Sequence, residues 1–217
     1  MSKIRKTRVL ACLGGCLFAR KRAMDRVHER ERRAAAEELR AVRIRSAQDE
    51  GYAALLRLME GSFPPEERRS EPQHRRALAE GDFHCLLLRE EGQVAGLLTY
   101  WRHRDFAFVE HLAVNPERRG RGLGHRIMHL LGEDLCPGVP IILEIEPVCD
   151  EITARRLRFY ESCGFVRLPD AHVQLPYHAG GSPLPMELLL HPCGAPAVCP
   201  PGFEDYVRGH VMQYVDR

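Results

Sequence analysis

The chain has 217 residues, of which 44% are hydrophobic and 29% are charged. This composition fits one globular domain with an appendage and excludes collagen-like, coiled-coil-only and wholly disordered chains. No apolar run approaches the ~20 residues of an ordinary membrane-spanning helix. Eight cysteines without any C-x-x-C pair spell out neither a zinc ribbon nor a disulfide framework. We therefore expect reduced thiols and a cytoplasmic protein.

The net charge of +2 hides a strong asymmetry along the chain. Residues 1–45 carry 14 Lys and Arg against 5 Asp and Glu, whereas the rest carries 18 against 25. An apolar stretch at 9–19 between basic runs resembles a signal peptide or lipoprotein signal, although it is short and arginines follow it at once. We interpret residues 1–41 as a basic appendage with a helix from about residue 24. It is either a targeting segment or the result of a start assigned too early, with Met24 as the true start.

Hydrophobic periodicity and turn residues predict the elements in chain order. A strand at 42–45 precedes a helix that Asp49 caps and that ends near Gly61. The apolar face of that helix carries Tyr52, Leu55, Leu56, Leu58 and Met59. A second, arginine-rich helix is predicted at 66–80, and the strands at 83–89, 94–102 and 106–114 form a meander.

A helix with Leu123, Ile127, Leu130 and Leu131 on one side follows the meander. Then come a strand at 140–145, a helix at 151–163 that stops at Gly164, a strand from Phe165, a loop at 176–183 and a strand at 186–190. The order predicts an α/β (α+β) domain over 42–191, with a mixed, mostly antiparallel central sheet flanked by helices. A C-terminal extension over 192–217 is predicted to contain a helix at 203–216.

The segment that carries chemistry runs from Phe108 to Met128. A strand leads into Arg119-Gly120-Arg121-Gly122-Leu123-Gly124 and then directly into an amphipathic helix. Glycines let the backbone approach a ligand, and the free N–H groups of the turn and the helix start form an anion site. The pattern is neither the G-x-G-x-x-G dinucleotide fingerprint nor a P-loop. It predicts a site for a pyrophosphate.

This turn resembles the acyl-CoA-binding motif R/Q-x-x-G-x-G/A of the Gcn5-related N-acetyltransferase (GNAT) superfamily, with Arg119, Gly122 and Gly124 at its positions. The helix that carries Tyr160 and ends in Gly164-Phe165 resembles the second motif of the superfamily, Y-x-x-x-G-F. The resemblance covers about residues 42–190. It implies the acyl-CoA N-acyltransferase fold and an acetyl-CoA-dependent N-acetyltransferase.

The resemblance also implies which residues hold acetyl-CoA. The backbone amides of Gly120, Arg121, Gly122, Leu123, Gly124 and His125 would bind the pyrophosphate, beside the Arg119 side chain. The pantetheine arm would run along Leu112, Ala113 and Val114, and the N–H of Leu112 would polarise the thioester carbonyl. Where many members have an asparagine that contacts this arm, the chain has Thr153. Tyr160 stands where the family tyrosine protonates the departing thiolate.

An amine acceptor attacks directly in this superfamily, so a base must remove a proton from the alkylammonium. Glu110 is our first choice, because the period-2 rule places it on the strand face of Leu112 and because an acid in an apolar strand is costly. His111 faces the other way on a regular strand, although a bulge could re-aim it. Glu144 and Glu146 are the alternatives on the next strand.

Acceptor specificity in this superfamily depends on the turn between the first two helices and on the loop before the last strand. These segments offer Phe63, Glu66, Glu67, Tyr177 and His178, which suit a cationic amine. The acceptor is a small-molecule or a protein amine. We expect no metal, because His191, Cys193 and Cys199 are irregularly spaced, and we interpret Cys163 as a packing residue.

Two other hypotheses stay open. The same domain could hold acyl-CoA as a sensor or interaction module without catalysis. The basic N-terminus could associate with nucleic acid, although its interleaved acids and lack of aromatic residues argue against this. We therefore expect neither a nucleic-acid nor a membrane partner, and a monomer or a homodimer.

Overall fold

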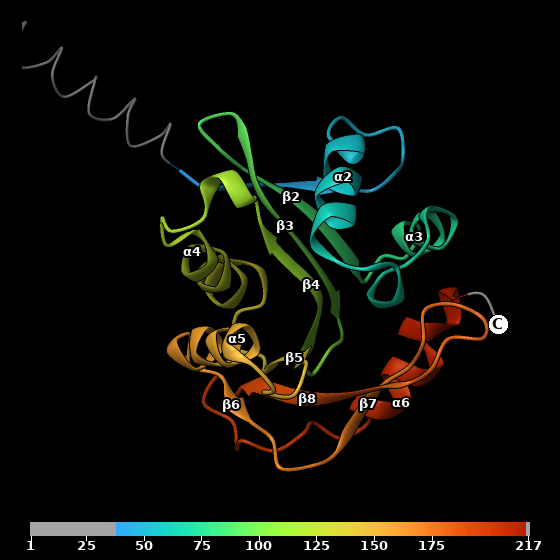
Figure 1. Cartoon of the computed structure of the whole chain (residues 1–217), viewed down its shortest axis with the longest axis vertical. Helices are drawn as coiled ribbons and strands as arrows, with labels where there is room; N and C mark the ends of the chain where they lie inside the picture. The colour runs from blue at the N-terminus through green and yellow to red at the C-terminus, as the bar shows by residue number, and fades with distance from the viewer. Residues whose placement is uncertain (1–37, 216–217) are drawn as a thin grey trace, which may run out of the picture. The chain divides into compact units, whose positions relative to one another are not determined.

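The computed structural model describes residues 38–215 (Figure 1). Its strands are β1 (Arg40–Ile44), β2 (Phe83–Glu90), β3 (Gln93–Arg102), β4 (Ala107–Val114), β5 (Ile141–Ile145), β6 (Val166–Arg167), β7 (His172–Gln174) and β8 (Leu184–His191). Its α-helices are α2 (Tyr52–Ser62), α3 (Glu71–Leu78), α4 (Leu123–His129), α5 (Glu151–Ser162) and α6 (Phe203–Gly209). The shorter turns are η1 (Pro65–Glu67), η2 (Pro116–Arg118), η3 (Leu130–Leu135) and η4 (Val211–Tyr214). The predicted helix from about residue 24 and position 216 lie outside the described residues.

The strands form a sheet in the order β1-β2-β3-β4-β5-β8-β6, with β7 paired to β8. Strands β4 and β5 run parallel, whereas the pairs β1–β2, β3–β4, β5–β8 and β6–β8 are antiparallel. This confirms the predicted mixed, mostly antiparallel sheet with one parallel crossover through a helix. The short strand β7 was not predicted, because it covers only three residues.

Helices cover both faces of the central strands. In Figure 1, α2 and α3 lie on one side of β2–β4, and α4 and α5 lie on the other. The first face holds a core that includes Leu55, Trp101 and Phe108, and the second holds a core that includes Ile127 and Leu143. The C-terminal segment packs into the first core through Phe203, Val207, Val211 and Met212. None of the helices within 38–215 is long and apolar enough to cross a membrane.

Two helix starts differ from the prediction. Asp49 does not cap α2, because its carboxylate accepts hydrogen bonds from the backbone N–H groups of Arg45 and Ser46. The N-cap of α2 is instead Gly51, whose backbone is in the left-handed conformation. The predicted helix at 66–80 is wrong in its first turn. A 3-10 turn occupies Pro65–Glu67, and α3 starts at Glu71 because Ser70 and Gln73 form a capping box there.

Candidate active site

Strands β4 and β5 separate part-way along their length. Three residue pairs join them, from Ala107 with Ile141 to Val109 with Leu143. Beyond Val109, β4 continues to Val114, while β5 continues its pairing with β8 as far as Ile145. Among the described residues, one backbone edge of the second half of β4 therefore pairs with no strand. That edge can exchange hydrogen bonds with an extended ligand.

The glycine turn after β4 is built as an anion cradle. Gly120 and Gly122 have φ of 79° and 70°, which side chains rarely adopt, and a Cβ on either would meet no atom within 4 Å. The first helical hydrogen bond of α4 runs from Arg126 N to Gly122 O at 3.2 Å. The N–H groups that precede it in α4 have no acceptor within the helix, so they are available to a bound phosphate.

Close packing fixes the cradle against α5. A Cβ added to Gly124 would lie 2.9 Å from the ring of Phe159, so any side chain there would push the helices apart. His125 donates or accepts across the same contact, with Nε2 2.9 Å from Ser162 Oγ. The glycines of this turn thus have two different roles. Gly120 and Gly122 adopt left-handed conformations, and Gly124 allows α4 and α5 to pack closely.

Tyr160 is buried in α5, with its ring against Phe159 and Phe165. Burial raises the pKa of its phenol to about 12, so the group is protonated at neutral pH. Its hydroxyl meets no hydrogen-bonding group among residues 38–215. A protonated phenol without a protein partner is suited to donate to a ligand atom.

Thr153 lies in the first turn of α5, where its side chain is already engaged. Its Oγ1 accepts hydrogen bonds from the N–H groups of Cys149 and Asp150, at 3.1 and 3.0 Å. The bond from Asp150 N–H and the bond from Thr153 N–H to Asp150 Oδ1, at 2.8 Å, form a capping box, and the Thr153 hydroxyl donates to the same Oδ1 at 2.8 Å. The cofactor contact that the resemblance implied for Thr153 stays a prediction, but the hydroxyl proton is already donated to Asp150.

A bulge at Glu110 changes which residues of β4 share a face. Thr99 pairs with His111 and Tyr100 pairs with Val109, so Glu110 is an extra residue without a partner on β3. The alternation reverses there: Phe108 and Ala113 face the α2–α3 side, and Leu112 packs toward α4 and α5. The prediction that Glu110 shares the face of Leu112 is therefore wrong.

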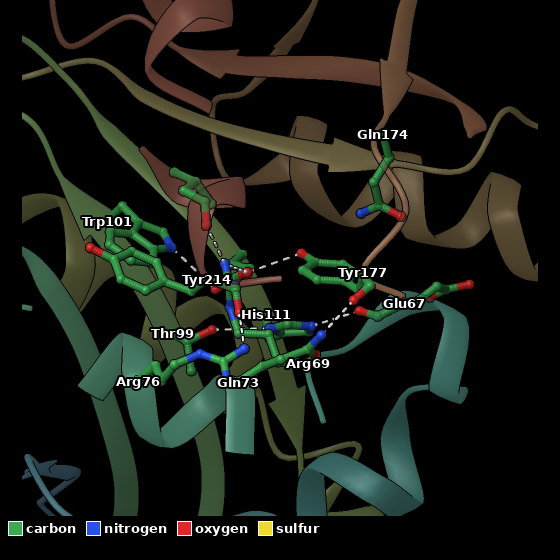
Figure 2. A network of polar contacts seen from close by, with 12 residues as sticks. Glu67, Arg69, Gln73, Arg76, Thr99, Trp101, His111, Gln174, Tyr177 and Tyr214 are labelled. Carbon is green, nitrogen blue, oxygen red and sulfur yellow. Dashed lines mark hydrogen bonds and ion pairs between the residues drawn. The ribbon is translucent and has the colours of Figure 1, made fainter. Parts of the chain in front are cut away.

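Glu110 forms a buried ion pair with Arg69, which lies between η1 and α3. Arg69 Nη2 is 2.8 Å from Glu110 Oε1, and each side chain is 1% exposed. Tyr177 Oη donates to the same oxygen at 3.0 Å, and Trp101 Nε1 donates to Oε2 at 3.2 Å. Both carboxylate oxygens of Glu110 thus have protein donors. Figure 2 shows Trp101, Tyr177 and Arg69 within this polar network.

The network sets the charge of the carboxylate. Burial raises the pKa of Glu110, but the charge of Arg69 and the hydrogen bonds from Trp101 and Tyr177 outweigh it and leave that pKa below its ordinary value. The guanidinium is also held by Val211 O at 2.9 Å and lies over the Trp101 and Tyr177 rings, at 5.6 and 5.4 Å. Glu110 is therefore ionised, paired and a weak base.

His111 lies on the same face as Glu110, as the bulge allows. Burial lowers the pKa of its imidazole, which is therefore neutral at pH 7. Its Nε2 is 2.8 Å from the carbonyl oxygen of Glu67, which only accepts, so Nε2 carries the proton. Nδ1 then accepts from the hydroxyl of Thr99 at 3.1 Å. His111 ties β4 to the turn η1 (Figure 2).

Four of the five predicted acceptor residues lie around the hydrogen bond between His111 and the Glu67 carbonyl oxygen. The ring of Phe63 packs edge-on against His111, with centroids 4.7 Å apart. His178 Nε2 lies 2.8 Å from Pro65 O, and Tyr177 is buried. Glu67 is half-buried, whereas Glu66 is exposed. The two segments expected to choose the acceptor thus meet over the bulge, and their role in binding stays a prediction.

A second buried polar group lies on β5. Glu144 Oε1 is 2.5 Å from His172 Nε2, and His172 Nδ1 is 2.8 Å from Glu204 of α6. Gln174 Nε2 donates to the other oxygen of Glu144 at 3.0 Å. Burial lowers the pKa of His172, but its two carboxylate partners outweigh burial and raise it. Glu144, an alternative base in the sequence, is thus also paired.

The sequence did not single out Arg69, Trp101 or His172. Arg69 stands in a run of charged residues that reads as solvated surface, and its burial depends on a partner far along the chain. The single tryptophan on a predicted strand was the one available signal. Within 38–215 no group of three metal-ligating side chains is present, and Cys85, Cys136, Cys149, Cys163, Cys193 and Cys199 are free thiols.

Comparisons with known proteins identify the family to which this fold belongs. A model of the acetyltransferase (GNAT) domain matches residues 81–167. A Bacteroides thetaiotaomicron protein described as an acetyltransferase of the GNAT family has a structure that is 30% identical, with a TM-score of 0.68 over 83% of this chain and 99% of that one. The chain belongs to the GNAT family of acetyltransferases. Its sheet and flanking helices have the fold predicted from the two motifs.

Two further relatives add detail. The Bacillus subtilis protein YjbC, named as an acetyltransferase, is 35% identical over 103 residues, which are 46% of this chain and 50% of YjbC. The chain thus spans about half the length of this curated relative. Arabidopsis thaliana Naa50, solved with the bisubstrate analogue CoA-Ac-MVNAL, is 19% identical with a TM-score of 0.51, over 70% of this chain and 97% of that one. At this identity the likeness concerns the fold.

Proposed function

We propose that this GNAT protein is an acetyl-CoA-dependent N-acetyltransferase that moves an acetyl group to a primary amine by direct attack in a ternary complex. One observation carries the proposal: the edge of β4 beyond Val109, which pairs with no strand within residues 38–215, is joined through the short turn η2 to the open glycine turn at Gly120–Gly122. An acyl-CoA is the ligand class that has both an extended amide-containing arm and a pyrophosphate. The Naa50 structure with a CoA conjugate supports the same cosubstrate.

In this proposal the backbone does most of the cofactor binding. The N–H groups of residues 120–125 hold the pyrophosphate, with Arg119 and Arg121 as nearby cations. The backbone of Leu112–Val114 exchanges hydrogen bonds with the pantetheine arm. The N–H of Leu112 donates to the thioester carbonyl oxygen and stabilises the oxyanion, an effect of roughly 3–4 kcal/mol for one donor at comparable sites.

We assign the role of acid to Tyr160. The amine attacks the carbonyl carbon, the C–S bond breaks, and the sulfur takes the phenolic proton. The raised pKa of Tyr160 keeps the proton on the phenol until the thiolate forms. The absence of a hydrogen-bond partner within the described residues leaves the hydroxyl available for this step.

Glu110 fits the role of a positioning residue better than that of a base. Its ion pair with Arg69 and its lowered pKa argue for a positioning role, in which Glu110 holds the two acceptor segments over the bulge. The acceptor is a small-molecule amine or a protein amine, and Phe63, Glu66, Glu67, Tyr177 and His178 are the residues proposed to surround it.

Incubation of the purified protein with acetyl-CoA and a panel of alkylamines and peptide N-termini tests the proposal. Mass spectrometry would detect an acetylated product together with equimolar CoASH. Tight acetyl-CoA binding by calorimetry without turnover of any amine would contradict the enzyme and favour an acyl-CoA-binding module. No acetyl-CoA binding at all would contradict both.

A further inference from the structure

We infer that Glu67, rather than Glu110, is the group that takes the proton from the acceptor amine. This inference rests on the proposed N-acetyltransferase function and identifies a catalytic residue for it. It follows from the position of η1, from the pairing of the other carboxylates near the bulge, and from the proximity of Glu67 to α5.

The turn η1 is fixed at the bulge from two sides. His111 Nε2 donates to the Glu67 carbonyl oxygen at 2.8 Å, and His178 Nε2 lies 2.8 Å from Pro65 O. One contact comes from β4 and the other from the segment before β8. Both use backbone oxygens of the turn, so the side chain of Glu67 takes no part in them. In Figure 2 this side chain extends away from the ring of His111.

The other carboxylates around the separation of β4 and β5 are committed to protein partners. Glu110 is paired with Arg69, Glu144 with His172 and Gln174, and Glu146 with Arg156. The carboxylate of Glu67 has no hydrogen-bond or ion-pair partner among residues 38–215, although it is half-buried. A half-buried carboxylate without a partner is suited to a ligand ammonium group.

Glu67 also lies within electrostatic range of the helix that carries the proposed acid. Arg156 of α5 acts on the charge of Glu67. Tyr160 follows Arg156 by four residues, which places both on one side of α5. The turn that carries Glu67 contacts β4 at His111, beyond the last residue that pairs with β5, and Tyr160 belongs to the helix that carries Arg156. An amine between them would have the proton acceptor and the proton donor on different sides.

The surroundings of Glu67 suit a base. Burial raises the pKa of its carboxyl above the ordinary 4.5, the charge of Glu66 adds to this, and the charge of Arg156 opposes it. The other titratable groups near the turn are Arg68 on the same loop, the neutral His111 on β4 and His178 beside Pro65. A higher pKa makes the carboxylate a better proton acceptor.

The proton balance of the reaction is complete with these two residues. An alkylammonium and acetyl-CoA give an amide, CoASH and one proton. Glu67 takes the first ammonium proton and passes it to bulk water, which frees the nitrogen lone pair for attack on the carbonyl carbon. The C–S bond then breaks and the sulfur takes the proton of Tyr160. The second nitrogen proton leaves as the intermediate collapses and restores the phenol.

The test is the pH dependence of kcat/KM in Glu67→Gln, with the best amine of the panel as the probe. We expect kcat/KM to fall by about 10²–10⁴-fold, and the acidic limb that depends on ionised Glu67 to disappear. Glu67→Asp should keep the limb with a smaller loss. Acetyl-CoA affinity and the thermal midpoint should stay unchanged in both variants, because the Glu67 side chain has no protein partner in residues 38–215.

Two comparison variants separate this role from a general effect of charge. Glu60→Gln removes one carboxylate from the exposed surface of α2 and should match the wild type. Glu66→Gln removes the neighbouring charge and should change KM while it keeps the acidic limb. A wild-type limb that survives in Glu67→Gln, with activity within threefold, would overturn the inference alone. A wild type that acetylates no amine would overturn the proposed function and this inference with it.

Discussion

The guanidinium of Arg69 and the carboxylate of Glu110 form an ion pair in which each side chain is 1% exposed. The pair joins the loop between α2 and α3 to the bulge of β4, and Val211 O connects the C-terminal segment to the same guanidinium. Burying two charges is costly, and the attraction between them offsets that cost only while both are present. The pair therefore holds the acceptor side of the site in one arrangement.

Removal of one partner should destabilise the fold strongly. Arg69→Met leaves Glu110 as a buried charge without its counter-ion, so we expect the free energy of unfolding to fall by about 3–5 kcal/mol. Arg69→Met with Glu110→Gln should recover part of this loss. Urea denaturation measures both. Arg75→Met is the control, because the ion pair of Arg75 with Glu71 is exposed to solvent and contributes little to stability. Equal decreases in the free energy of unfolding for Arg69→Met and Arg75→Met would contradict this prediction.

Stability should decrease from pH 6.5 toward pH 4 because of His74. Burial lowers its pKa from 6.5 to about 4, so over this range the unfolded chain binds a proton that the folded chain does not. Stability from this residue is present above pH 6.5 and is lost as pH falls, by roughly 3 kcal/mol at pH 4. Urea titrations of His74→Gln should show a shallower pH slope than those of the wild type. An unchanged slope in His74→Gln would contradict the assignment.

Gly122→Glu should abolish acetyl-CoA binding. Gly122 has φ of 70° and is the N-cap of α4, so a glutamate there adds backbone strain and places a negative charge beside the proposed pyrophosphate site. We expect calorimetry to show a loss of affinity greater than about 100-fold, which is ~2.7 kcal/mol. Gly138→Glu is the matched control, since Gly138 has φ of 71° and open space around it but lies before β5. Equal affinity in both variants would move the cofactor site elsewhere.

Tyr160→Phe should separate chemistry from binding. The hydroxyl has no protein partner within 38–215, so its removal should leave the thermal midpoint and the acetyl-CoA affinity nearly unchanged. We expect kcat to fall by about 10²–10³-fold, because the thiolate then leaves without a proton donor. Steady-state kinetics and calorimetry on one preparation decide the matter. Full activity in the variant would assign the acid to another group.

The fold could be predicted from local patterns, because alternation, glycine turns and helix periodicity act over a few residues. The left-handed glycine turn could be predicted for the same reason, whereas the role of Tyr160 comes from the family resemblance and stays a prediction. The orientation of Glu110 could not, since its bulge depends on how β3 and β4 pair. The burial of Arg69 could not either, because its partners Glu110 and Val211 come from distant segments. The start of α3 was missed although Ser70 and Gln73 carry a readable capping signal.

The extra residue at Glu110 determines which side chains in the second half of β4 face each side of the sheet. Before the bulge, even-numbered residues of β4 face α2 and α3; after it, odd-numbered residues do. Leu112 therefore faces α4 and α5, while His111 contacts the turn η1 on the other side. Deletion of this one residue would move each side chain in the second half of β4 to the opposite side of the sheet. We therefore expect a one-residue deletion within β4 to be far more damaging than a one-residue change in the length of a connecting loop.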